Sequence, residues 1–120
     1  MTQTVRPGAA ALSEVLRRRI IPVVVVDDPA DAVPLSEALY AGGLPVAEVT
    51  FRTGAAAASI TAMAQNPNML VGAGTIIHPD QVDAAAEAGA RFLVSPGFSR
   101  AVIRRAQEIG LPIIPGIQNS

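Results

Sequence analysis

A glutamate and an arginine stand four positions apart in the segment 46–53, whose other residues are typical of a β-strand. Successive side chains of a strand point to opposite faces, so Glu48 and Arg52 share one face with Val46 and Thr50. The other face is wholly apolar and consists of Ala47, Val49 and Phe51. Buried charged groups are rare unless they are paired or functional. The pattern indicates either a salt-bridged glutamate on an edge strand whose polar face is in water, or charged groups kept there for a chemical function.

Small and turn-forming residues follow the other predicted strands. They are Gly74-Thr75, Ser95-Pro96-Gly97 and Pro115-Gly116. In a parallel sheet these strand ends share one edge, and glycine lets a ligand approach the backbone closely. Taken singly, each of these sequences is an ordinary turn, since glycine and proline commonly mark the start or end of a loop. Their recurrence beside Glu48 favours a binding site at that edge.

The elements that must position these residues alternate regularly along the chain. We predict helices at 7–19, 29–40, 53–63, 79–88 and 99–109, and strands at 20–26, 46–53, 69–73, 91–95 and 111–114. Strands that alternate with helices predict a parallel sheet with right-handed crossovers. The strand at 20–26 is apolar on both faces, which is typical of a buried parallel strand.

Two α/β architectures fit this order, an open doubly wound sheet and part of a closed (β/α) barrel. A charged pair such as Glu48 and Arg52 has little place in the middle of an open sheet that is covered on both faces. At the carboxyl ends of barrel strands, polar side chains form active sites. We therefore predict a single domain, 1–120, that is a partial parallel (β/α) barrel of the TIM type with a leading helix at about 7–19.

Composition excludes several classes of function. The net charge of −1 gives no reason to expect nucleic acid or a membrane surface as a partner, and the absence of cysteine rules out disulfides and thiolate metal sites. His78, the one histidine, cannot form a metal cluster alone, so we expect no metal and no cofactor. The N-terminal residues do not resemble a signal peptide, and the apolar run 20–26 is too short to span a bilayer. These features predict a cytoplasmic protein.

The sequence Gly72-Ala73-Gly74 invites comparison with a dinucleotide-binding loop. That fingerprint requires a further glycine or alanine three residues on, where this chain has Ile77, and an acidic residue about twenty positions later, which is missing. The chain also has no phosphate-binding loop of the Gly-Lys-Ser/Thr kind. We reject nucleotide binding on these grounds.

Five segments in order resemble one known family, and together they cover nearly the whole chain. They are Ile21-Pro22-Val23-Val24, Glu48-Val49-Thr50-Phe51-Arg52-Thr53, Val71-Gly72-Ala73-Gly74-Thr75, Ser95-Pro96-Gly97 and Ile114-Pro115-Gly116-Ile117. The family is that of the 2-keto-3-deoxy-6-phosphogluconate (KDPG) aldolases, also called 4-hydroxy-2-oxoglutarate (KHG) aldolases. The resemblance implies a homotrimeric class I aldolase of the Entner–Doudoroff type on an eight-stranded barrel. Such an enzyme cleaves a keto-deoxy sugar acid phosphate to pyruvate and glyceraldehyde 3-phosphate.

The same resemblance implies roles for four residues. Glu48 matches the general acid/base of the family. Arg52 and Thr75 match the groups that hold the pyruvate carboxylate, and Pro96 matches a residue that lines the substrate pocket. Glu48 and Arg52 are separated by roughly 13 Å of extended strand, a gap that the long arginine side chain partly closes by folding back.

The chain also departs from the family pattern. The resemblance implies a Schiff-base lysine on a sixth strand and phosphate-binding glycines on later strands, whereas this chain contains no lysine. About five strands leave an open edge rather than a closed barrel. Three interpretations stay open: the N-terminal part of a longer aldolase, a half-barrel that pairs with another chain, and a non-catalytic binding or assembly module.

Overall fold

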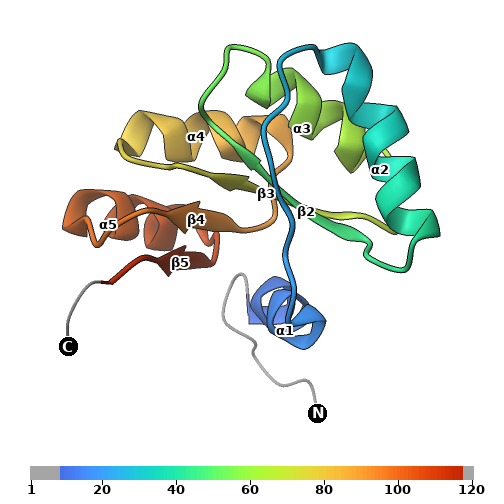
Figure 1. Cartoon of the computed structure of the whole chain (residues 1–120). Helices are drawn as coiled ribbons and strands as arrows, with labels where there is room; N and C mark the ends of the chain where they lie inside the picture. Colours follow the sequence, from blue (N-terminus) through green and yellow to red (C-terminus); the bar gives the residue numbers. More distant parts are fainter. Residues whose placement is uncertain (1–8, 118–120) are drawn as a thin grey trace.

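The computed structural model describes residues 9–117 (Figure 1). The strands are β1 Val23–Val24, β2 Val46–Thr50, β3 Leu70–Gly74, β4 Leu93–Ser95 and β5 Ile113–Pro115. The helices are α1 Ala9–Arg18, α2 Ala32–Ala41, α3 Ala56–Ala64, α4 Pro79–Ala88 and α5 Arg100–Ile109, with a short 3-10 helix, η1 Pro29–Asp31, before α2. The predicted alternation of helices and strands is confirmed. The predicted start of the first helix at Pro7 lies outside the described residues.

All strand pairs are parallel, and the strand order in the five-stranded sheet is β1-β2-β3-β4-β5. A doubly wound sheet would reverse its strand order at a switch point. Here each strand pairs with the next one along the chain. The crossover helices α2 to α5 form one layer on one side of the strands (Figure 1). This is the winding of a (β/α) barrel, so the prediction of a partial barrel is confirmed.

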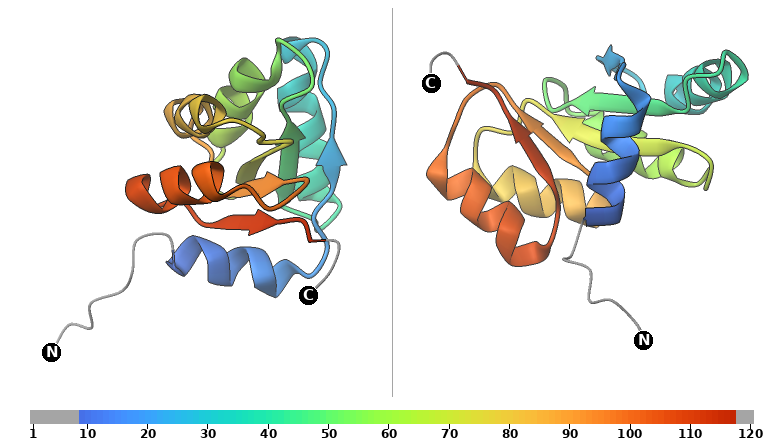
Figure 2. Two further views of the ribbon diagram at one scale, coloured as in Figure 1. Left: turned by 90° about the vertical axis from the view of Figure 1, so that its left-hand side faces the viewer. Right: turned by 90° about the horizontal axis from the view of Figure 1, so that it is seen from below.

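The two faces of the sheet carry separate apolar clusters. The outer cluster joins the sheet to the crossover helices and includes Ala47, Val49, Val71, Ala73, Leu93, Ile60, Met63, Val82, Val102 and Ala106. The inner cluster is smaller, and its buried members are Val15, Val46, Leu70 and Phe92. Since Val15 belongs to α1, the leading helix covers the inner face near the amino ends of the strands (Figure 2).

The first strand is shorter and more exposed than predicted. Pairing with β2 covers only Val23 and Val24, and the side chain of Val23 is 61% exposed. Val26 is buried in the outer cluster. The prediction of a strand buried on both faces from 20 to 26 was wrong, because β1 is an edge of the sheet and has a neighbour on one side only among the described residues.

The second strand ends earlier than predicted. All five residues of β2 are buried, but Phe51 and Arg52 lie in the turn that follows it. The strict alternation of faces therefore stops at Thr50, and Arg52 is not on the inner face of a strand. Phe51 packs against the outer cluster as predicted, although it is only half-buried.

Helix ends follow the local chemistry of the sequence. Gly89 and Gly110 end α4 and α5 with φ angles of 106° and 80°, a left-handed conformation that glycine adopts without steric cost. Ser99 caps α5 by accepting a hydrogen bond from the amide of Val102 at 3.4 Å. Pro34 falls within the first turn of α2, where no amide hydrogen is required, so it need not bend the helix.

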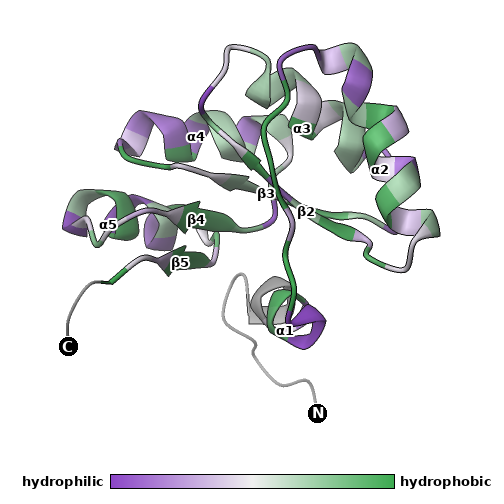
Figure 3. Ribbon diagram, viewed as in Figure 1, coloured by the Kyte–Doolittle hydropathy of each residue, from purple (hydrophilic) through white to green (hydrophobic). Residues whose placement is uncertain are grey.

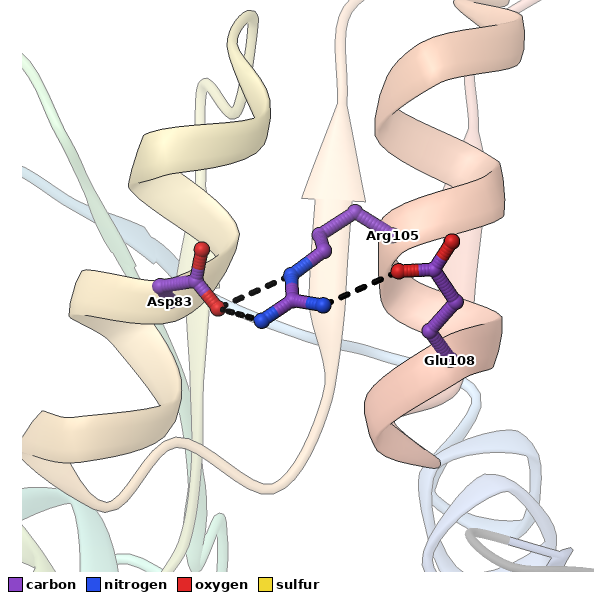
Figure 4. A network of polar contacts seen from close by, with 3 residues as sticks. All are labelled: Asp83, Arg105 and Glu108. Atoms are coloured by element: carbon purple, nitrogen blue, oxygen red, sulfur yellow. Dashed lines mark hydrogen bonds and ion pairs between the residues drawn. The ribbon is translucent and has the colours of Figure 1, made fainter.

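The outer surface of the helix layer is more hydrophilic than the strands, and it carries a three-residue ion network (Figures 3 and 4). Arg105 on α5 donates from Nε and Nη2 to Oδ1 of Asp83 on α4, at 3.0 and 2.7 Å. Its Nη1 donates to Glu108 at 2.9 Å. These three side chains are partly exposed, and the Arg105–Asp83 ion pair links α5 to α4. We therefore assign the network a structural role. Within residues 9–117 no helix has the length and apolar character needed to cross a membrane.

The two apolar faces predict different costs for two phenylalanine truncations. Phe92 is fully buried in the inner cluster, whereas Phe51 is half-buried at the rim of the outer one. We expect Phe92→Ala to lower the free energy of unfolding by about 3–5 kcal/mol and Phe51→Ala by roughly half as much. Urea unfolding followed by circular dichroism measures both. Equal costs for the two variants would contradict the burial assigned to Phe51.

Candidate functional site at the carboxyl edge of the sheet

Glu48 is the central ionisable residue of the inner face. It lies in the middle of β2, where its backbone amide donates to the carbonyl of Pro22 at 2.9 Å. Its side chain is only 5% exposed and extends over β3 toward Gly74. No salt bridge to Glu48 is formed by the part of the chain that the structure describes. A buried carboxyl group without a charged partner in contact is unusual, and it favours the chemical interpretation over the salt bridge on an edge strand.

The environment of Glu48 changes its acidity. Burial raises the pKa of the Glu48 carboxyl above its ordinary value, because the charged form loses hydration. The positive charge of Arg52 opposes this and lowers the pKa by a smaller amount. A carboxyl group with a raised pKa holds a proton more readily than an ordinary glutamate, which suits a group that accepts a proton and later returns it.

Arg52 occupies the turn after β2, and three hydrogen bonds hold that turn in place. The amide of Phe51 donates to the carbonyl of Gly74 at 2.9 Å, which ties the turn to β3. On the other side the hydroxyl of Thr53 donates to the carbonyl of Val26 at 2.5 Å and accepts from the amide of Ala55 at 3.2 Å. Arg52 as a whole residue is exposed. It is therefore available to an anion at the edge of the sheet.

Thr75 follows β3 directly and has an unusual backbone. Its φ angle is 58°, in the left-handed region, where a β-branched residue is strained. Such strain costs of the order of 1–3 kcal/mol and clusters at functional sites. The side chain is partly buried. The turn places Thr75 at the same edge of the sheet as the end of β2, since Thr50 and Gly74 are paired.

Pro96 follows β4 at the same edge and is exposed. Two contacts fix the chain around it. The hydroxyl of Ser95 donates to the carbonyl of Gly97 at 2.9 Å, and the amide of Gly116 donates to the carbonyl of Ser95 at 2.8 Å. The ends of β4 and β5 are thereby joined. All four predicted site residues thus belong to β2, β3 and β4 or to the turns that directly follow them.

Two further residues of this region have roles that the sequence analysis did not assign to them. Thr53 anchors the turn that carries Arg52, and Gly74 lies under the carboxyl group of Glu48. A sequence signal existed for Gly74, because glycines two positions apart in a strand share one face. The described residues contain no group of three or more histidine and acidic side chains that could hold a metal ion.

The fold and the polar residues at one edge of the sheet place the chain among proteins of the (β/α)-barrel class. The family model for KDPG and KHG aldolases matches residues 12–120. The chain belongs to the KDPG and KHG aldolase family.

Individual relatives agree with this assignment. A 2-dehydro-3-deoxy-phosphogluconate aldolase of Treponema pallidum is 48% identical over 105 residues, which is 87% of this chain and 50% of the relative. The crystal structure of the Zymomonas mobilis ZM4 2-keto-3-deoxy-6-phosphogluconate aldolase with 3-phosphoglycerate is 44% identical. It superimposes with a TM-score of 0.80 over 83% of this chain and 48% of that one.

A third match is the KDPG aldolase of Legionella pneumophila, with pyruvate captured at low pH as a covalent carbinolamine intermediate. It is 40% identical and has a TM-score of 0.81 over 96% of this chain and 54% of that one. The chain spans about half the length of these relatives.

The raised pKa of Glu48 predicts a pH-dependent stability difference. A carboxyl group whose pKa is higher in the folded than in the unfolded state stabilises the fold below its unfolded pKa, and this contribution is lost as the pH rises through the folded pKa. We therefore expect Glu48→Gln to be more stable than the parent at neutral pH and equally stable below about pH 4. Urea unfolding across this pH range measures the difference. An advantage of the variant that persists at low pH would contradict the assignment.

The strained turn predicts opposite results for two substitutions of Thr75. Thr75→Gly relieves the left-handed strain but adds flexibility to the unfolded chain, so we expect a net gain in unfolding free energy of about 1 kcal/mol. Thr75→Ala keeps a Cβ atom in the same conformation and should give no such gain. Thermal unfolding of both variants tests this. An equal gain for alanine would show that the backbone at residue 75 is not strained.

Proposed function

We propose that this chain forms the N-terminal portion of a class I KDPG/KHG aldolase barrel, in which Glu48 moves protons and Arg52 and Thr75 hold the carboxylate of a keto acid. The observation that carries the proposal is the buried Glu48 carboxyl group, which lies on the inner face of a barrel sheet and makes no salt bridge to the residues described. Membership of the family supports the reaction type. The pyruvate adduct of the Legionella relative supports covalent chemistry with a keto acid.

The proposed reaction divides into binding and proton transfer. The guanidinium of Arg52 and the hydroxyl of Thr75 bind the carboxylate of the substrate at the edge of the sheet. An amine of the completed enzyme forms an iminium with the keto group and releases water. Glu48 accepts the proton of the substrate hydroxyl as the neighbouring carbon–carbon bond breaks, which releases the aldehyde and leaves an enamine. It then returns the proton to the enamine carbon, and hydrolysis of the resulting iminium releases pyruvate.

The Schiff-base lysine must come from outside these 120 residues, because the sequence contains no lysine. We propose that a C-terminal (β/α) segment supplies this lysine and closes the barrel, and that Pro96 lines the resulting pocket. On the same basis we propose a cytoplasmic homotrimer that acts in the Entner–Doudoroff route on keto-deoxy sugar acid phosphates. The aldehyde product would be glyceraldehyde 3-phosphate.

A second candidate function rests on a separate observation. β1 and β5 are both edges of the described sheet, and Val94 and Ile114 on its inner side are only partly buried. A half-barrel with these open surfaces is suited to assembly with another chain. Size-exclusion chromatography with light scattering distinguishes the two candidates. A stable closed oligomer of the 120-residue chain would favour the assembly module.

The experiment for the aldolase proposal uses the chain by itself and joined to the C-terminal half of a related aldolase. Pyruvate and borohydride, followed by intact mass and peptide mapping, should give no side-chain adduct on residues 1–120 alone and one lysine adduct on the chimera. Glu48→Gln in the chimera should lower turnover by about 10²- to 10⁴-fold while trapping persists, since the carboxylate and not the amine is removed.

Arg52→Ala serves as the matched variant in the same chimera. It removes a contact made to the carboxylate before and during reaction, so we expect KM for the keto acid to rise first. Unchanged turnover of the Glu48→Gln chimera would refute the role of Glu48 as the proton carrier. A side-chain adduct on the isolated chain would refute the requirement for an external lysine.

A further inference from the structure

We propose that Gly74 is a positioning residue for Glu48, because its missing side chain leaves the space on the inner face of β3 that the Glu48 carboxyl group occupies. This inference rests on the proposed function where it concerns turnover. The geometric part depends only on the packing of β2, β3 and Phe92, the residue before β4.

The inner face of β3 presents two glycines in succession, and each one underlies a different large group. A Cβ atom at Gly72 would lie 2.4 Å from Cε2 and Cζ of Phe92. A Cβ atom at Gly74 would lie 2.5 Å from both Cδ and Oε1 of Glu48 and 2.8 Å from its Cγ. Distances this short are sterically forbidden. The two glycines therefore make room for an aromatic ring and for a carboxyl group, side by side on one strand.

The register of the sheet gives this packing a direction. Glu48 is paired with Gly72, and Gly74 is paired with Thr50, two residues nearer the carboxyl edge. Because the Phe92 ring fills the space over Gly72, the Glu48 side chain does not lie over its own pairing partner. It extends instead over Gly74, toward the edge where Arg52 and Thr75 lie. The ring of Phe92 and the absence of a Cβ atom at residue 74 together direct the Glu48 carboxyl group toward the carboxyl edge of the sheet.

An alanine at residue 74 should move Glu48 rather than disrupt the fold. The atoms in conflict belong to the outer part of a flexible side chain, which can rotate away, whereas the alanine at 72 would conflict with a fully buried ring. With Phe92 on one side and the new methyl group beneath it, the carboxyl group has to turn outward to water. We expect Gly74→Ala to lower the pKa of Glu48 toward its ordinary value, since hydration of the charged form is restored.

The first test measures the titration of Glu48 in the 120-residue chain. Glutamate labelled with carbon-13 at the side-chain carboxyl is followed by NMR, and the Glu48 signal is assigned by its loss in Glu48→Gln. Gly54→Ala is the matched control, because a Cβ atom at Gly54 would meet nothing within 4 Å. We expect the Glu48 titration to move to lower pH in Gly74→Ala and to stay in place in Gly54→Ala. An unchanged titration in folded Gly74→Ala would overturn the proposal.

A second variant covers the case in which Gly74→Ala does not fold. Combining it with Glu48→Ala removes the group that the new methyl would strike. We expect circular dichroism to show that the double variant folds as well as Glu48→Ala alone. A double variant that stays unfolded would overturn the proposal, since the conflict would then lie elsewhere than with Glu48.

A third test measures turnover in the chimera described above, in which the chain is joined to the C-terminal half of a related aldolase. Displacing a proton-transferring group by about an ångström costs about 10²-fold in rate, so Gly74→Ala should lower kcat by about that factor. KM should change little, because Arg52 and Thr75 keep their places, and borohydride trapping should persist. If Glu48→Gln lowers kcat and Gly74→Ala does not, the positioning role fails and the proposed function stands. If Gly74→Ala moves the titration while Glu48→Gln leaves turnover unchanged, the packing is right and the proposed function fails.

Discussion

Parallel pairing of each strand with the next one in the sequence determines which residues of this protein lie close together at the edge of the sheet. Because β1 to β5 run in one direction and in one order, every turn that follows a strand opens at the same edge of the sheet. Thr75 and Pro96 are far apart in the chain, yet both follow strand ends at this edge. The crossover helices lie together on the outer side (Figure 1). On the inner side, α1 covers only the part near the amino ends of the strands, and the Glu48 carboxyl group lies beyond it over Gly74.

The outer and inner sides of the sheet serve different purposes. The outer cluster is large and continuous, and it unites the sheet with the crossover helices through aliphatic side chains. Among the described residues the inner cluster has four buried members, and it stops before the carboxyl edge. A buried carboxyl group and a strained threonine both lower the stability of the fold. Thr75 lies at the carboxyl edge with the exposed Arg52, and the Glu48 side chain extends toward this edge from the middle of β2. The aliphatic outer side supplies most of the apolar burial.

The packing around Glu48 shows a role of glycine that does not depend on an unusual backbone conformation. Neither Gly72 nor Gly74 has a left-handed backbone. Both are required because the groups above them, Phe92 and Glu48, approach the backbone of β3 too closely for a Cβ atom. The same residues that invited comparison with a dinucleotide loop thus have a steric role inside a barrel sheet.

The sequence by itself determined the order of the elements, the parallel sheet and the barrel winding, because periodicity, caps and alternation are local properties of the chain. The left-handed helix ends at Gly89 and Gly110 and the cap at Ser99 depend in the same way on residues next to them in the chain. The segments around Glu48, Thr75 and Pro96 were also sufficient to identify the family.

Only the tertiary structure decided where β2 ends, how exposed β1 is and what the glycines of β3 accommodate. The end of a strand depends on its partner strand. Arg52 lies in a turn rather than in β2 because hydrogen bonds to the carbonyls of Gly74 and Val26 fix that turn. The direction of the Glu48 side chain depends on Phe92, whose ring fills the space over Gly72. Phe92 lies more than forty residues from Glu48 in the sequence. Periodicity within one strand carries no information about side chains that reach it from a neighbouring strand, so this packing was beyond sequence reasoning.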